Sequence, residues 1–257
     1  SDRGPSMGPD MLAPVDAAGQ FIPAAPLVPI DVAHRTGMLH RGVWLHVLSA
    51  DGALLLVTRA PTMATCAGKR SIIGEHHNGR ETDGACASRA IREELPGLAQ
   101  VFDSLTPFPL RARPRWFLFD YPPVSGGAPR YDRCLISEYV LHLPSNASAS
   151  LAAIRAGRQS ESEHEASEIT FEPLVRVVRQ LHRQRSSFCA HELLPDALFD
   201  TIGDLLRHPS LTSTLRTTAT ALEQAASRVR ADGQWRRTTT TGKAMPENYD
   251  LSRLVRG

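Results

Sequence analysis

The sequence lacks the features that mark several common classes of protein. No apolar run approaches the roughly 18 residues that a membrane-spanning helix needs, and the opening letters SDRGPSMGPDMLAP hold no apolar core of the kind found in a signal peptide. The sequence also has no large excess of positive or negative charge, because 29 lysines and arginines nearly balance 27 aspartates and glutamates. A net charge of +2 gives no strong electrostatic case for binding nucleic acid.

Cysteine is scarce and unpaired in the sequence. The four cysteines stand far apart, with no C-x-x-C spacing, at Cys66, Cys86, Cys134 and Cys189. This pattern favours free thiols in a reducing compartment over a disulfide framework or a zinc site. We therefore expect four free thiols and a location in the cytoplasm, with an organellar matrix as the alternative.

Composition divides the chain into three parts. Residues 1–29 are rich in proline, glycine and alanine and predict a flexible leader. Residues 30–208 carry most of the apolar runs and predict the main domain, since 42% hydrophobic residues suffice for a full core. Residues 209–257 predict a further helix and a polar, threonine-rich extension. The extension is either draped over the surface or used to bind a partner, and a homodimer is equally open.

Alternating apolar runs and turn residues predict a mixed sheet with helices. Two runs joined by Asp51-Gly52 are typical of a hairpin, and a second, longer hairpin spans a Pro/Gly-rich loop. We expect strands at 43–48, 53–60, 70–74, 115–121, 133–143 and 169–174, and helices at 82–95, 175–184 and 195–208. This order of elements indicates an α+β fold.

The most informative stretch begins at Gly74 and reads GEHHNGRETDGACASRAIREELPGL. Thr82 or Asp83 is a good N-cap, and Pro96 with the following glycine ends the helix. Carboxylates three or four residues apart share one helix face. Such carboxylates supply the oxygen ligands that Mg²⁺ prefers, and a diphosphate needs that cation to neutralise its charge.

This stretch resembles the box of the Nudix superfamily, G-x5-E-x7-R-E-U-x-E-E-x-G-U. Glu81, Arg89, Glu93 and Glu94 fall in register with it. Over about residues 30–205 the resemblance implies a Nudix fold, a mixed β-sheet sandwiched between α-helices. It also implies hydrolysis of a diphosphate linkage in a nucleotide derivative or small phosphorylated metabolite with Mg²⁺ or Mn²⁺. Glu93 and Glu94 would then be metal-binding and catalytic, Glu81 a supporting ligand or an orienting group in catalysis, and Arg89 the structural brace.

Two departures from the box put turnover in question. Ala90 stands where the family has a metal-binding glutamate, and Glu75 stands where the box opens with glycine. Glu75 as a metal ligand, or Glu165 from the acidic loop 161–168 as a base, would compensate. The alternative is a Nudix-fold protein without turnover that binds a phosphorylated ligand or another protein.

Substrate-binding candidates lie outside the box helix. Arg113 and Arg115 in the run RARPRW present guanidinium groups that match phosphate oxygens, and His76 lies in the loop before Glu81. A basic strand edge at the surface explains the arginine run equally well.

A second resemblance concerns the stretch DVAHRTGMLHRGVWLHVLSADGALLLVTRA followed by GEHHNG. It is similar to the subgroup that includes isopentenyl-diphosphate isomerases, which implies that His34, His40 and His76 correspond to metal-binding histidines. The catalytic cysteine of those isomerases falls at Gly74, and their later Glu-x-Glu pair is met by Asp132 alone. Glycine cannot transfer the proton that a thiol transfers, so isomerase activity ranks third.

Overall fold

The computed structural model describes residues 10–63, 65–95, 97–98, 106–121, 128–144, 166–189 and 194–215. Glu165, most of the acidic loop and most of the 209–257 extension lie outside these ranges. The expected roles of that glutamate and of the extension therefore stay predictions. Within the described residues, no helix is long and apolar enough to cross a membrane.

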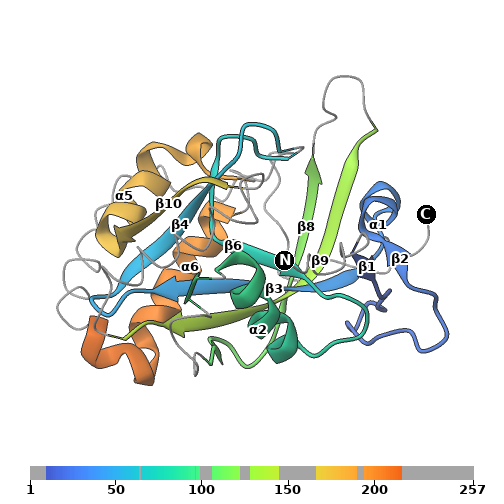
Figure 1. Ribbon diagram of the computed structural model, residues 1–257, viewed down its shortest axis with the longest axis horizontal. Coiled ribbons are helices and arrows are strands. Elements are labelled where there is room, and N and C mark those ends of the chain that lie inside the picture. The colour runs from blue at the N-terminus through green and yellow to red at the C-terminus, as the bar shows by residue number, and fades with distance from the viewer. Residues whose placement is uncertain are drawn as a thin grey trace, which may run out of the picture.

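The described chain forms one large sheet, a small ribbon and several helices (Figure 1). The sheet contains β3 (His40–Leu48), β4 (Ala53–Arg59), β5 (Arg70–Ser71), β6 (Ile73–His76), β7 (Phe108–Pro109), β8 (Arg115–Tyr121), β9 (Arg130–His142) and β10 (Ala166–Pro173), and the ribbon pairs β1 (Met11–Leu12) with β2 (Val28–Pro29). The helices are α1 (Ile30–Thr36), α2 (Asp83–Glu94), α5 (Leu174–Arg183) and α6 (Leu194–Arg207), with short 3₁₀ turns η1 (Arg185–Ser187) and η2 (Pro209–Leu211).

The sheet is mixed, in the order β10-β4-β3-β9-β7. Strands β3 and β4 join at their ends through the pair Leu48↔Leu54, and then diverge so that β6 pairs with β3 and β5 with β4. Strand β9 runs parallel to β3 and antiparallel to β8. Both predicted hairpins are therefore confirmed, and β3 stands at the centre with β6 and β9 on its two sides.

Side chains alternate between the two faces of the sheet, and each face is covered by helices. On one face Leu45 and Val47 belong to the same core cluster as Ala90 and Ile91 of α2. On the other face β3 and β4 contribute to a cluster with α5 and α6, which includes Leu48, Leu54, Leu56, Val177, Leu181, Leu198 and Ile202. Each fully buried leucine contributes about 1.5–3 kcal/mol to folding. The predicted α+β architecture, a mixed sheet between helices, is confirmed.

The N-terminal segment differs from the flexible leader expected for residues 1–29. Leu12 and Val15 are 1% and 3% exposed, so residues 10–29 contribute to the packed domain. The guanidinium of Arg80, next to the box, donates to three carbonyl oxygens of this segment, those of Ile22, Pro23 and Ala25. Pro/Gly-rich composition gave no sign of the short strands β1 and β2 or of the apolar side chains Leu12, Ala13 and Val15 that the domain buries.

The expectation of four free thiols is wrong for two of them. Cys66 and Cys189 form a disulfide although 123 residues separate them in the sequence. The isolated bridge between Arg70 and Phe188 brings the loop after β4 against the chain that follows η1. Cys86 and Cys134 are free and buried, as expected. Only the long-range pairing of strands reveals which cysteines meet.

A buried ionic group connects β9 to α6. Glu138 is 3% exposed and its carboxylate accepts a hydrogen bond from Thr201 Oγ1 at 2.6 Å and another from Arg115. His46 Nε2 lies 3.1 Å from the same carboxylate, and Arg111 Nε lies 3.3 Å away. The group is well satisfied for a buried charge, and it joins the helix to the sheet.

Glu138 predicts a specific loss of stability in acid. Burial alone raises the pKa of Glu138, but the hydrogen bond from His46 and the charges around it outweigh burial and lower it from 4.5 to about 2. Because its pKa is depressed, the Glu138 carboxylate stabilises the fold above pH 4.5. This stabilisation is lost as the pH falls towards about 2. One pKa unit corresponds to about 1.4 kcal/mol. In Glu138→Gln, the acid-induced loss of unfolding free energy (the acid limb) should therefore be smaller by up to about 3 kcal/mol.

Urea unfolding across this pH range, for wild type and variant, measures the effect. Glu168→Gln is the matched control, because Glu168 is exposed and lies on β10 opposite Thr58 of β4. An acid limb of equal steepness in the wild type and Glu138→Gln would contradict the prediction.

Candidate metal centre and acidic box

The box helix begins and packs as its sequence predicts. The Thr82 side chain accepts a hydrogen bond from the backbone N–H of Ala85 at 3.2 Å, which caps the first turn of α2. Ala90, at the position where the family has a glutamate, is completely buried in the cluster beneath α2. A carboxylate at that position would lie against apolar side chains, so the alanine suits the packing of this chain.

Arg89 is the centre of the acidic box. Its Nη1 lies 2.7 Å from Glu93 Oε2 and 3.2 Å from Glu75 Oε1, and its Nη2 lies 2.7 Å from Glu81 Oε1. Its Nη2 also donates to the carbonyl oxygen of His76 at 2.5 Å. The acidic side chains therefore converge on one guanidinium from β6, from the loop after it and from α2. These are the contacts that a structural brace requires, although its catalytic importance stays a prediction.

The box holds more negative charge than Arg89 neutralises. Burial, together with repulsion from Glu94 and Glu93, raises the pKa of Glu75 to about 8 against the opposing effect of Arg89. Carboxylates crowded in this way favour a bound cation, and their oxygens suit Mg²⁺ or Mn²⁺. Metal ligation by Glu75, Glu81, Glu93 and Glu94 stays a prediction, because three of these carboxylates are paired with Arg89 and the described box residues form no cluster of ligand atoms within 4.8 Å of one another.

A second group of ligand-bearing side chains lies on the other side of β6. One ligand atom from each of His34, His40, His76 and Asp132 lies within 4.8 Å of the others. The three imidazole rings form a near-regular triangle, with centroid separations of 5.1, 5.2 and 5.4 Å. We call these four residues the histidine centre.

Strand pairing and one tight turn build the histidine centre. His40 begins β3 and lies opposite Cys134 of β9, while Gly42 lies opposite His76 of β6. Gly37 ends α1 in the left-handed conformation, φ 67°, and turns the chain so that His34 faces back towards β3. The histidine centre therefore lies where one end of β3 meets its neighbours β6 and β9.

Gly42 permits the close approach of these strands. A Cβ atom at Gly42 would lie 2.8 Å from the carbonyl oxygen of Glu75 and 2.9 Å from Cys134 Sγ. Any larger residue would separate β3 from β6 or displace the thiol. The histidine centre therefore depends on glycine at this position.

The electrostatics of the histidine centre suit metal ligation. Burial lowers the pKa of His34 to about 4 and that of His76 to about 3, so both rings are neutral near pH 7. His40 Nδ1 lies 2.8 Å from the carbonyl oxygen of Met38, which leaves Nε2 as the nitrogen with a free lone pair.

Three buried ligand atoms of the centre lack a hydrogen-bond partner within the described chain: His34 Nε2, His40 Nε2 and Asp132 Oδ1. His40 Nε2 lies 3.4 Å from Asp132 Oδ1, which is too long for a strong hydrogen bond. Orphaned polar atoms at this depth are costly unless a ligand satisfies them. Imidazole with one carboxylate suits manganese, iron, cobalt or zinc better than magnesium.

A cavity of about 190 Å³ opens beside the histidine centre. Glu75 and His76, consecutive residues of β6, both line it. Its wall carries the aromatic side chains Trp44, Phe117, Phe119 and Tyr121 and the cationic side chains Arg59 and Arg130. The cavity therefore combines a place for cations, two positive groups for an anionic ligand and an apolar surface.

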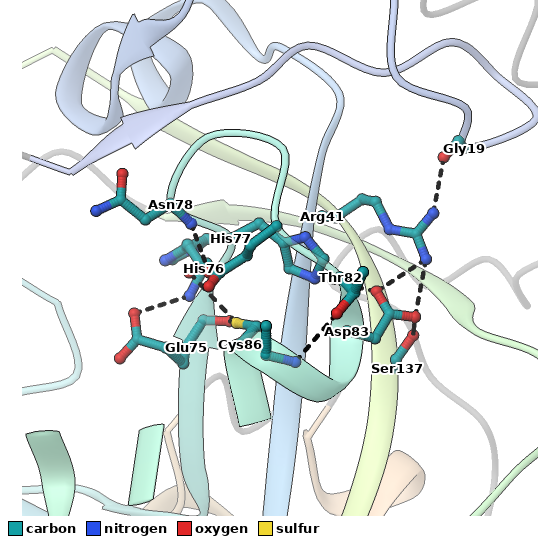
Figure 2. Close-up of polar contacts among 12 residues, drawn as sticks. Gly19, Arg41, Glu75, His76, His77, Asn78, Thr82, Asp83, Cys86 and Ser137 are labelled. Atoms are coloured by element: carbon teal, nitrogen blue, oxygen red, sulfur yellow. Dashed lines mark hydrogen bonds and ion pairs between the residues drawn. The ribbon is translucent and has the colours of Figure 1, made fainter. Parts of the chain in front are cut away.

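Figure 2 shows a further polar network, at the start of α2. Asp83 accepts hydrogen bonds from Arg41 Nη2 at 2.9 Å and from Ser137 Oγ at 2.6 Å, and His77 Nε2 lies 3.0 Å away. Burial alone raises the pKa of Asp83, but His77 and Ser137 lower it to about 2. These contacts tie the N-terminal end of α2 to β3 and β9. His77 belongs to this tie, whereas its neighbour His76 belongs to the histidine centre.

The other predicted substrate-binding residues lie elsewhere. Arg115 pairs with buried Glu138, and Arg113 is exposed on the segment before β8; neither lines the cavity. Arg59 and Arg130 line it instead, and sequence reasoning missed both. The signal for Arg130 was its spacing, because Arg130, Asp132 and Cys134 are two residues apart and share one face of β9.

The described residues form an α+β fold, a mixed sheet between helices, and the solved structures similar to this chain include a Nudix hydrolase. Three of them are the MutT protein from Methanosarcina mazei Go1 (14% identity, TM-score 0.36, 55% of this chain and 81% of that chain covered), DR0079 from Deinococcus radiodurans (16%, 0.40, 66% and 88%), and the Nudix hydrolase RenU from M. smegmatis (18%, 0.22, 47% and 87%). No family model and no curated protein matches the chain. At these identities and TM-scores, the likeness to these structures assigns no activity to this chain.

Proposed function

We propose that this protein is a metal-dependent hydrolase that cleaves a diphosphate linkage in a nucleotide derivative or a small phosphorylated metabolite. One observation supports the proposal: Glu75 of the acidic box and His76 of the histidine centre are consecutive in β6, and both line the same cavity. Successive side chains of a strand point to opposite faces. Strand β6 therefore directs Glu75 towards the acidic box and His76 towards the histidine centre.

The residues of the chain divide the work in this proposal. Glu93 and Glu94, with Glu75 and Glu81, hold Mg²⁺ or Mn²⁺, and Arg89 keeps the carboxylates together. When bound, the cation would neutralise phosphate charge and polarise phosphorus towards attack by water. Arg59 and Arg130 face the phosphate oxygens, and the aromatic wall shields the rest of the ligand from water.

A second candidate function follows from Ala90. Alanine at this position leaves the box one carboxylate short, and Ala90 is completely buried. The missing carboxylate favours a protein that binds a phosphorylated ligand without turnover. Isomerisation of an allylic diphosphate ranks third, because Gly74 stands at the position of the isomerases' catalytic cysteine and burial raises the pKa of the Cys134 thiol, which also lines the cavity.

Phosphate release from a panel of diphosphates with Mg²⁺, for wild type and Glu94→Gln, tests the proposal. The variant keeps the shape of the side chain and removes its charge, so hydrolysis should fall by about 10²–10³-fold, as for loss of other transition-state-stabilising groups. Arg92→Gln is the control, since Arg92 is exposed on the same helix.

Two results would contradict hydrolysis. One is turnover by Glu94→Gln at the wild-type rate, which would place the reaction outside the box. The other is no phosphate release from any diphosphate by the wild type, combined with tight, metal-independent ligand binding, which would support the binding protein.

A further inference from the structure

Arg130 occupies an unusual place beside the histidine centre. It begins β9, lines the cavity, and its Nη2 lies 3.0 Å from Nδ1 of His34. Its Nε is buried and has no hydrogen-bond partner within the described chain. Among the described residues, the guanidinium therefore makes one hydrogen bond, to an imidazole, and keeps N–H donors for a ligand.

This contact is incompatible with a metal ion on His34. A guanidinium can only donate, so His34 Nδ1 accepts, and the proton of the neutral ring stands on Nε2. If the metal bound Nε2, that proton would have to move to Nδ1, which could then no longer accept from Arg130. If the metal bound Nδ1 instead, Arg130 would block it directly. In either case Arg130 has to leave His34 before the ring can act as a ligand.

We infer that Arg130 exchanges partners, from His34 without a cation to a phosphate group of the ligand when the histidine centre is loaded. Its charge repels a dication as long as it stays beside the ring. An anion in the cavity offers the guanidinium a bidentate partner, and Arg59 on the same wall adds a second positive group. Arg130 is thus a positioning residue that makes cation binding and phosphate binding mutually favourable.

This inference rests on the proposed function for the phosphorylated ligand in the cavity, and it adds a cation at the histidine centre to the one that the proposal gives to the acidic box. It goes beyond it in assigning to one residue the coupling between metal and substrate. Linkage requires the coupling to be reciprocal: phosphate tightens the cation by the same factor as the cation tightens phosphate. The coupling can therefore be measured without turnover.

The experiment titrates metal-free, full-length protein with Co²⁺ and follows the visible absorption of cobalt bound to histidine, with and without inorganic phosphate. In the wild type, phosphate should tighten Co²⁺ binding by about 5- to 150-fold, the usual range of coupling between sites. Arg130→Met should bind Co²⁺ about 3- to 10-fold more tightly than wild type without phosphate, because one nearby positive charge is gone. Phosphate should no longer help this variant.

Two further variants make the result specific. Arg130→Lys keeps the charge but not the planar fork, so it should retain weak Co²⁺ binding without phosphate and lose most of the coupling. Arg133→Met removes the same charge from the opposite face of β9, where Arg133 pairs with Asp120, and should match the wild type. Circular dichroism verifies that each variant is folded.

The outcomes separate the inference from the proposed function. Co²⁺ binding and phosphate coupling that are the same in wild type and Arg130→Met overturn the inference and leave the metal centre intact. Co²⁺ absorption that is unaffected by His40→Asn in the wild-type background shows that cobalt does not bind at the histidine centre and overturns the inference, whereas hydrolysis at the acidic box is decided by the Glu94→Gln assay.

Discussion

Replacing Arg89 by alanine is expected to destabilise the protein by about 3–5 kcal/mol, the cost of removing one partner from a buried ion pair. Arg89 is 13% exposed in its side chain, and Glu75 and Glu81 are 12% and 18% exposed. Without the guanidinium these carboxylates and Glu93 would face one another with no compensating charge. Urea unfolding at neutral pH, in the absence of divalent cations, measures the loss.

Two comparisons make the Arg89 result decisive. Arg92→Ala on the same helix should change the free energy of unfolding by less than about 0.5 kcal/mol, as exposed substitutions do. Adding Mg²⁺ should restore part of the stability lost in Arg89→Ala, because a cation that binds only the folded state stabilises it. A loss of the same size in both arginine variants would show that the box carboxylates are not crowded.

Replacing His40 by asparagine is expected to weaken cation binding at the histidine centre by about 100-fold or more. Changing a residue that only supports a metal ligand costs about 10- to 100-fold in affinity, and loss of a ligand itself should cost at least as much. His40 is 1% exposed in its side chain, and its Nε2 faces Asp132. Asparagine keeps a donor near the carbonyl of Met38 but withdraws the nitrogen from the centre. The Co²⁺ dissociation constant, from visible absorption, is the measurement.

His77→Asn is the matched control for this change. His77 follows directly after His76 but pairs with Asp83 at the start of α2, outside the histidine centre. It should leave the cobalt spectrum and dissociation constant unchanged while lowering thermal stability. If His77→Asn weakened cobalt binding as much as His40→Asn, the loss would reflect a disturbed fold and not a lost ligand.

Much of the box could be predicted because its geometry is local. Thr82 caps α2 through a contact three residues away, and Arg89 meets Glu93 one helical turn later. Both contacts follow from the pitch of an α-helix whatever the rest of the chain does. The convergence of Glu75 and Glu81 on Arg89 was only partly accessible, since it also needs β6 to run beside α2.

The histidine centre was suggested only by resemblance, since its four members come from four separate elements. Their meeting depends on the register of β6 and β9 against β3, and a slip of one residue would turn His76 or Asp132 to the other face. The same limit explains Arg115, which the sequence presents as a free basic residue and the fold places against Glu138.

The sequence by itself determined the elements whose signals are short-range: the two hairpins, the capped box helix and the amphipathic helices, because hydrophobic period and turn chemistry act within a few residues. Tertiary structure alone decided the disulfide between Cys66 and Cys189, the packing of residues 10–29, and which arginines reach the cavity. These features join residues that are distant in the chain. Their contacts are set by strand register and by the packing of whole elements, which no local pattern encodes.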